Sequence, residues 1–473
     1  MSFNSSNYAW FLVLVFCLFW LLHKKREARN GLLLIASWSF YAAWDWRYLS
    51  LILFSTGLDF FVGQALGRCD PGDDKQKRKR RLLLTMSLVG NLGLLGVFKY
   101  YGFFTSELQA LLPIDIPRLD LLLPVGISFY TFQTLSYTID VYWGKLKPTR
   151  NLAEFALFVA FFPQLVAGPI VRASEFIPQF EREPWLDRHR LLYGMSRIMD
   201  GLIKKVVIAD VLAIHLVEPV FAEGSTATGL HVLLGIYGYA MQIYCDFSGY
   251  SDIAIGSARI LGFYIPENFK VPYTARSIQD FWHRWHISLS SWLRDYLYIP
   301  LGGNRLGPVR TYVNLMLTML LGGLWHGAGW NFIVWGAMHG AWLAINRFWD
   351  RRKLPWFRGV AGSVVGTFMT FQLVCLAWVF FRSSTSTQAM DVLDRLTSSG
   401  DLHWGLVPSL NPWVWVALVL GYTTHFLPRQ LVEGLRELVI RLPAFFWGML
   451  WVLVFGLLAY LAVEKVPFIY FQF

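Results

Sequence analysis

Residues 8–30 read YAWFLVLVFCLFWLL and then HKKREARN, an apolar run followed directly by a basic stretch. The same alternation continues along the 473 residues, of which 55% are hydrophobic and only 15% charged, against about 25% charged in soluble proteins. Apolar runs of ~20 residues are what a helix needs to cross a bilayer. The pattern excludes a soluble globular protein and predicts an all-α polytopic membrane protein with about ten to twelve transmembrane or re-entrant helices.

The formal net charge of +11 does not indicate a nucleic-acid partner. The basic residues cluster in loops between apolar runs, so membrane topology explains them better than a polyanion does. Because positive residues follow the first apolar run instead of preceding it, we interpret that run as a retained span and not as a cleavable signal. The four cysteines form no CxxC pair and no disulfide framework, and we assign them no chemistry.

The basic loops predict which side of the membrane each segment faces. Gly31–Ala43 and Tyr48–Gly67 are separated only by Trp44–Arg47, which suggests a tight hairpin with both flanking loops in one compartment. Both flanking loops are rich in lysine and arginine, and the positive-inside rule makes that compartment the cytoplasm. Between Leu152 and Phe263, prolines and charged residues interrupt the apolar sequence. This indicates broken helices that line an interior, or else an interfacial amphipathic helix.

We expect a single membrane domain over residues 1–473, with two distinctive segments near its centre. Residues 264–313 are polar, basic and aromatic, which predicts a cytoplasmic segment that lies on the membrane. Residues 314–349 are too short for two full crossings of ~20 residues each plus a turn, and glycines interrupt them. Short or broken helices are therefore expected there.

His326 is the most informative residue of this broken segment. It lies in residues 321–330, LGGLWHGAGW, and at ~1.5 Å per helical residue it would sit about 18 Å beyond the basic loop, near mid-membrane. A buried imidazole can take a proton from a hydroxyl, as acyl transfer from a thioester to an alcohol requires, and the flanking glycines would let a substrate approach closely. A structural histidine hydrogen-bonded between helices is the alternative that these residues leave open.

Two further clusters carry polar groups within apolar sequence. Residues 281–288 read FWHRWHIS, which places His283 and His286 on one face if the segment is helical. No metal-ligand pattern accompanies them, so we expect no metal, and binding of lipid headgroups is the alternative. Residues 244–252 read YCDFSGYSD, and burying their carboxylates and hydroxyls in lipid would be costly. These side chains would either stabilise a helix break through hydrogen bonds to the backbone or line a substrate path.

Taken in order, these motifs resemble the membrane-bound O-acyltransferase superfamily, and within it the bacterial branch that is similar to alginate O-acetyltransferases. The resemblance covers nearly the whole chain. It is carried by residues 124–130 (PVGISFY), 162–169 (FPQLVAGP), 246–252, Asn268 with Phe269, 281–298 and 325–327. It implies a single domain with a buried catalytic tunnel in the bacterial cytoplasmic (inner) membrane.

The resemblance also implies site residues. The catalytic role falls on His326, with His286 as the second functional position. His283 departs from the Trp-Arg-Arg-Trp-His pattern common among relatives, which argues against a family-wide role for it. Secondary residues that match the motifs and would bind substrate or donor are Asn268, Arg284, Arg294, Asp295, Asp246, Ser248, Asp252 and Trp325.

The implied reaction moves an acetyl group from a cytoplasmic thioester, acetyl-CoA or an acyl-carrier donor, toward an extracytoplasmic polysaccharide. Expected partners are a periplasmic SGNH-like acetyltransferase and membrane lipids, with no nucleic acid and no permanently bound cofactor. A basic surface of Lys270, Arg276, Arg284 and Arg294 would attract the phosphates of a coenzyme. The alternatives are D-alanyl or other acyl transfer by another branch, and transport of a polysaccharide or acyl carrier with His326 as a proton relay.

Overall fold

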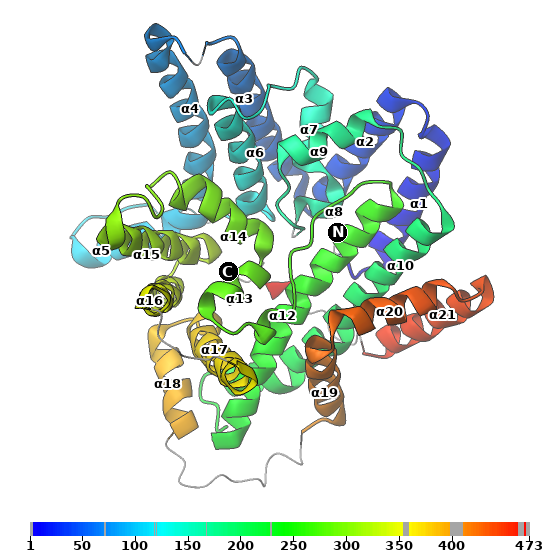
Figure 1. Cartoon of the computed structure of the whole chain (residues 1–473), viewed down its shortest axis with the longest axis vertical. Helices are drawn as coiled ribbons and strands as arrows, with labels where there is room; N and C mark the ends of the chain where they lie inside the picture. Colours follow the sequence, from blue (N-terminus) through cyan, green and yellow to red (C-terminus); the bar gives the residue numbers. More distant parts are fainter. Residues whose placement is uncertain are drawn as a thin grey trace. The chain divides into compact units, whose positions relative to one another are not determined.

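The computed structural model describes residues 3–70, 72–117, 119, 121–166, 168–227, 229–352, 359–397, 410–461 and 468–469. Within these ranges the regular structure is entirely helical, and they contain no strand (Figure 1). The predicted all-α fold class is confirmed. The helices fall into two compact units, the first comprising Met1–Met195 with Ala254–Pro266 and the second Ser196–Ile253 with Glu267–Phe473.

The first unit is built around α3, which packs on α4, α6 and α7, while α2 packs on α1 and α7. Its helices are α1 (Ser6–Leu22), α2 (Arg26–Asp45), η1 (Trp46–Tyr48), α3 (Leu49–Gly67), α4 (Asp74–Leu95), the π-helix η2 (Gly96–Tyr100), α5 (Tyr101–Leu111), α6 (Ile127–Tyr142), α7 (Leu152–Ala160), α8 (Phe162–Leu165), α9 (Ala173–Glu181), the start of α10 (Arg188–Leu202) and the end of α12 (Gly229–Ile260). Between α2 and α3 the chain breaks at Asp45, which has extended backbone angles and a carboxylate that accepts from the Arg47 backbone.

A buried carboxylate joins three helices of the first unit. Asp59 on α3 is fully buried and accepts hydrogen bonds from Thr138 Oγ1 on α6 at 2.7 Å, from Asn91 Nδ2 on α4 at 2.7 Å, and from the Ser87 hydroxyl. Such a group would be costly in an apolar interior without partners. These donors explain how the acidic residue is accommodated inside an apolar helix.

The second unit contains the segments that the sequence analysis singled out. Its helices are the end of α10 (Arg188–Leu202), the π-helices η3 (Ile203–Asp210) and η4 (Ala213–Val217), α11 (Glu218–Phe221), most of α12 (Gly229–Ile260), η5 (Pro272–Thr274), α13 (Ile278–Arg284), α14 (Ile287–Leu293), η6 (Arg294–Tyr298), α15 (Gly307–His326), α16 (Trp330–Arg352), α17 (Gly359–Arg382), α18 (Ser386–Thr397), α19 (Pro412–Phe426), α20 (Arg429–Ile440) and α21 (Ala444–Leu461). Helix α12 runs without interruption through residues 244–252. The first of the two alternatives for these residues, a helix break, is therefore wrong.

Helices α15 and α16 form a closely packed pair joined at residues 327–329 (Figure 1). A Cβ atom on Gly323 would lie 2.1 Å from the backbone oxygen of Phe332, and one on Gly336 would lie 2.4 Å from the backbone oxygen of Met319. A Cβ on Gly327 would lie 2.0 Å from the Phe332 ring. We expected the glycines beside His326 to let a substrate approach. Instead, atoms of α16 fill the space beside Gly323 and Gly327, because the close packing of α15 on α16 requires residues without a side chain at these positions.

Among the residues that the structure describes, four helical segments are long and apolar enough to cross a membrane: Arg26–Gly67, Asp74–Leu111, Gly359–Arg382 and Ala444–Leu461. The shorter α1 is also apolar. The larger count of ten to twelve membrane segments stays a prediction, as does the single-domain organisation of residues 1–473.

Candidate active site

His326 ends α15 in the second unit and is almost completely buried. Aromatic side chains meet its imidazole edge to face on three sides. The ring centroids lie 4.9 Å from Trp325, 5.1 Å from Trp335 and 5.2 Å from Phe381.

His286 lies directly before α14, with φ +42° and ψ 55°, in the left-handed region that non-glycine residues seldom adopt. Helix α13 ends at Arg284, so His283 is exposed while His286 is completely buried. The expectation that these two histidines share one helical face is therefore wrong. The break in the helix turns His286 inward, where its ring stands perpendicular to Phe247 at 4.6 Å.

Trp325 connects the two histidines. Its ring lies 5.9 Å from that of His286 and packs edge to face on the neighbouring His326. Forty positions apart in the chain, the two predicted functional histidines therefore lie against one tryptophan inside a single aromatic cluster. Water-poor surroundings of this kind protect a reactive thioester from hydrolysis.

Asn268 fixes the state of His286. Its Oδ1 atom accepts from His286 Nδ1 at 3.3 Å, from the Ser288 backbone N–H at 3.1 Å and from Ser288 Oγ at 2.9 Å. An imidazole that donates from Nδ1 keeps its lone pair on Nε2. Burial also lowers the pKa of His286 to about 3, so the ring is neutral at physiological pH.

Replacing Asn268 with leucine removes the acceptor that three donors share. We expect the variant to unfold at lower temperature by the equivalent of about 1–3 kcal/mol and to lose most activity, since the tautomer of His286 is no longer set. The measurement is thermal unfolding in detergent combined with an acyl-transfer assay. Asn268→Asp, which keeps an acceptor at this position, should lose less of both, and equal losses in the two variants would contradict the assignment.

The pKa of His286 also predicts a pH dependence of stability. The folded protein holds this ring neutral, while the unfolded chain binds a proton below its ordinary pKa of about 6.5. The contribution is therefore present above pH 6.5 and is lost progressively as the pH falls toward 3. We expect the melting temperature of the wild type to fall more steeply over this range than that of His286→Asn, which tolerates the left-handed backbone. Parallel curves would contradict the buried neutral state.

The basic residues expected to meet the donor lie beside these helices. Arg284 donates to Asp280 Oδ1 at 2.8 Å and to Thr274 Oγ1 at 3.0 Å. Arg294 pairs with the adjacent Asp295 at 2.7 Å and is largely exposed. The ion pair with Asp295 holds the Arg294 guanidinium at the surface. The roles of Arg284, Arg294 and Asp295 in binding the acyl donor stay predictions.

Asp246 is buried on α12 and pairs with Lys205 of η3 at 2.8 Å. Lys205, which is 1% exposed, also pairs with Asp210 at 2.8 Å. The second oxygen of Asp246 accepts from the backbone N–H of Ile469 at 2.7 Å. The carboxylate thus joins α12, the π-helix and the C-terminal segment.

Asp252 lies further along α12 and has two cationic partners. Lys204 Nζ lies 2.6 Å from it, and Arg197 pairs both with Asp252 and with Glu267, the latter at 2.9 Å. Ser248, between the two aspartates, is buried. The ion pairs explain why the charged residues of α10 and η3 occur in apolar sequence, and a substrate-binding role for Asp246, Ser248 and Asp252 stays a prediction.

Sequence reasoning missed the aromatic walls of the site. Trp335 and Phe381 come from α16 and α17, and both contact the His326 ring. Trp335 in turn packs on Trp378 at 5.9 Å. The tight glycine-mediated packing of α15 on α16 helps to place Trp335 there, and the adjacent Gly336 is a signal of this packing in the sequence.

Comparison with known proteins agrees with this architecture. A family model described as the membrane-bound O-acyltransferase family matches residues 146–380, which include both histidines. A probable alginate O-acetylase AlgI of Pseudomonas syringae pv. tomato is 44% identical over 435 residues, covering 90% of this chain and 81% of the relative. A peptidoglycan O-acetyltransferase of Helicobacter pylori is 39% identical, covering 76% of this chain and 72% of the relative. A teichoic acid D-alanyltransferase of Streptococcus thermophilus is 33% identical, covering 54% and 68%.

The apolar helices and these matches together define a membrane enzyme of acyl transfer. The chain belongs to the membrane-bound O-acyltransferase family, and within it resembles the alginate O-acetylases of Pseudomonas. It is a membrane protein and an O-acyltransferase, as the sequence motifs predict.

Proposed function

We propose that this enzyme moves an acetyl group from a cytoplasmic thioester, acetyl-CoA, to hydroxyl groups of an extracytoplasmic polysaccharide. The convergence of His326 and His286 on Trp325 carries the proposal, because acyl transfer needs a base held in a dry cavity. The two similar enzymes named for alginate and peptidoglycan O-acetylation support a polysaccharide acceptor.

In this mechanism His326 takes the proton of an acceptor hydroxyl while the hydroxyl oxygen attacks the thioester carbonyl. The carbon–sulfur bond then breaks, an ester forms, and the imidazolium returns its proton to the departing thiolate. The acceptor hydroxyl belongs either to the saccharide or to a group that relays the acetyl onward, and the proton balance is the same for both. His286, neutral and fixed through Nδ1, offers Nε2 as the second functional nitrogen.

The enzyme would work in the bacterial cytoplasmic membrane, with acetyl-CoA approaching from the cytoplasm. Arg284 and Arg294 lie on the basic segment 264–313 and supply positive charge for the coenzyme phosphates. A periplasmic SGNH-like acetyltransferase would take the acetyl group to the final polymer. The proposal thus goes beyond family membership, because it names the acyl donor, the direction of transfer across the membrane and the periplasmic partner.

The test is label transfer in inside-out membrane vesicles, which expose the cytoplasmic face. Radiolabelled acetyl-CoA added outside should give polymer-bound label inside the vesicles once acceptor and periplasmic partner are enclosed. Label that appears only when acetyl-CoA is enclosed with the polymer would overturn the proposed direction of transfer.

D-alanyl transfer is the second candidate, because the D-alanyltransferase of Streptococcus thermophilus is 33% identical over about half of this chain. A carrier protein loaded with labelled D-alanine distinguishes the two in the same vesicles. Transfer from acetyl-CoA with none from the D-alanyl carrier supports acetylation, and the opposite pattern supports the second candidate.

A further inference from the structure

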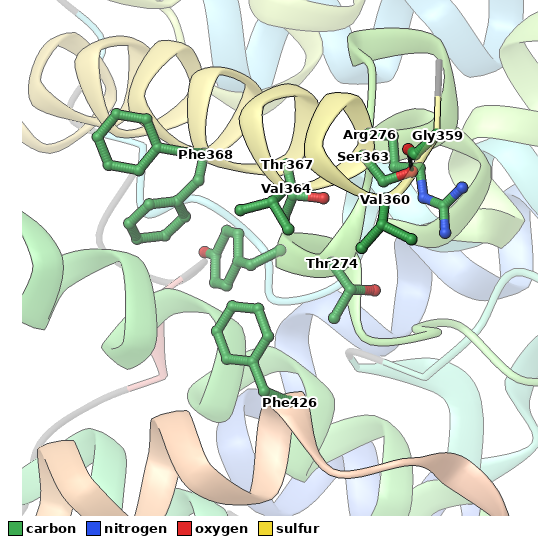
Figure 2. A pocket seen from close by; sticks show the side chains of 11 residues that line it. Thr274, Arg276, Gly359, Val360, Ser363, Val364, Thr367, Phe368 and Phe426 are labelled. Atoms are coloured by element: carbon green, nitrogen blue, oxygen red, sulfur yellow. Dashed lines mark hydrogen bonds between the residues drawn. The ribbon is translucent and has the colours of Figure 1, made fainter. Parts of the chain in front are cut away.

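A groove of about 910 Å³ lies in the second unit away from the paired histidines (Figure 2). Its volume is within the ~300–1,000 Å³ typical of sites for small molecules. Figure 2 shows Arg276 and the amino end of α17 at one extremity, Phe368 at the other, and Phe426 of α19 facing α17 across the groove. One end is therefore cationic, and the remainder is mainly apolar, with the hydroxyl groups of Thr274, Ser363 and Thr367 in its lining.

The cationic end carries uncompensated charge. The Asp280 carboxylate pairs with Arg284 at 2.8 Å and meets Arg276 only through the backbone N–H of that residue. Within the described part of the chain the Arg276 guanidinium has no hydrogen bond or ion pair. Guanidinium groups present a fork of donors that fits phosphate oxygens, so this end favours an anion, and a phosphate above others.

The apolar wall belongs to a helix that can span a membrane. Val360, Val364 and Phe368 of α17 line the groove, and they are 84%, 64% and 59% exposed. Residues 360 and 368 are separated by about 12 Å at ~1.5 Å per helical residue, which suits a stretch of hydrocarbon chain. Apolar side chains exposed on a spanning helix face lipid, so the groove opens toward the acyl chains of the bilayer.

An aromatic layer closes the groove on its inner side. Tyr273 lines the groove and is buried, and its ring packs 5.2 Å from His425 and 6.2 Å from Trp285. Trp285 packs on Trp378 at 5.1 Å, and only beyond Trp378 does Trp335 reach His326. Neither His326 nor His286 lines the groove, although Trp285 is the chain neighbour of His286, so the groove is separate from the two histidines.

We propose that this groove binds an anionic glycerophospholipid of the surrounding membrane, with its phosphate on Arg276 and one acyl chain along α17 between Phe368 and Phe426. The positive charge at one end of the groove matches the phosphate of such a lipid, and the open apolar wall along α17 matches its acyl chain. A free coenzyme would leave the apolar wall unoccupied. The assignment concerns lipid binding alone and does not depend on which acyl group or acceptor the enzyme uses.

The test measures phosphatidylglycerol retained by the full-length purified protein after extraction from phosphatidylcholine nanodiscs that contain it, using native mass spectrometry. Arg276→Gln removes the cation and Val364→Trp fills the groove. We expect each to bind phosphatidylglycerol about tenfold more weakly, which corresponds to about 1.4 kcal/mol. Matched controls are Arg305→Gln, an exposed arginine of the same basic segment, and Val365→Trp, the next residue of α17, which does not line the groove. Both controls should bind as the wild type does.

A second measurement uses the wild type, so that misfolding of a variant cannot obscure the result. Phosphatidylglycerol with a photoreactive group in its acyl chain should crosslink within residues 359–371 or at Phe426. Crosslinks elsewhere, or unchanged retention in both groove variants, would overturn the proposal. Unchanged lipid retention with a raised KM for acetyl-CoA in Arg276→Gln would assign this end to the coenzyme instead.

Discussion

Replacing His326 with alanine is expected to lower the rate of acetyl transfer by about 10²- to 10⁴-fold, the range that a positioned general base contributes. The residue is buried, ends α15 and contacts three aromatic rings, and an alanine at this position supplies no group that could act as the base. The loss should appear in kcat with little change in the KM for the donor, because the imidazole acts on the reacting hydroxyl. Initial rates in membranes with matched expression provide the measurement.

His283→Ala is the control, because this exposed histidine belongs to the neighbouring motif 281–288, which also contains the buried His286. It should retain wild-type activity. Comparable losses in the two variants would mean that replacing even an exposed histidine of this region lowers activity for structural reasons, and the catalytic assignment of His326 would fail.

The second large effect is expected from Lys205→Met. The lysine is buried between Asp246 and Asp210 at 2.8 Å from each, so its removal leaves two carboxylates inside the protein without their cation. Breaking a buried pair from one side costs about 3–5 kcal/mol. We expect poor accumulation of the folded protein and a melting temperature far below that of the wild type, measured in detergent.

Lys204→Met is the control for this prediction. The neighbouring lysine is 29% exposed, and its partner Asp252 retains Arg197. A smaller loss of about 1 kcal/mol is therefore expected. If Lys205→Met were as stable as Lys204→Met, the buried ion pairs would not hold α12 to the π-helix.

The helical class could be predicted from the sequence because it leaves a local signal, whereas the functional roles of His326 and His286 come from the family resemblance and stay predictions. Apolar runs between basic loops indicate a membrane protein. A histidine within an apolar sequence is costly to bury in a membrane, which makes it a candidate functional residue. The glycines around His326 are evident in the sequence too, but their role in helix packing could not be predicted from it. Gly323 serves the packing of α15 on α16, and only the position of Phe332 in three dimensions reveals it.

The partners of the site could not be predicted, since they depend on tertiary structure. Lys205 and Asp246 are each recognisable in the sequence as a charge that is costly in apolar surroundings, but they are 41 positions apart. They pair because Lys205 lies in the π-helix η3. A π-helix has no clear signal in the sequence. The left-handed turn at His286 is similarly hidden. A regular helix would have put His286 on the same face as His283, and the turn instead buries it against Phe247.

The most direct test of the account is transfer of label from acetyl-CoA in membranes that contain the wild type, His326→Ala, His286→Ala or the double variant at matched expression. If both histidines serve one site around Trp325, the double variant should lose no more activity than the more damaging single variant, because residues that act as a unit are not additive. Losses that multiply in the double variant, or label retained by His326→Ala, would contradict a single catalytic site.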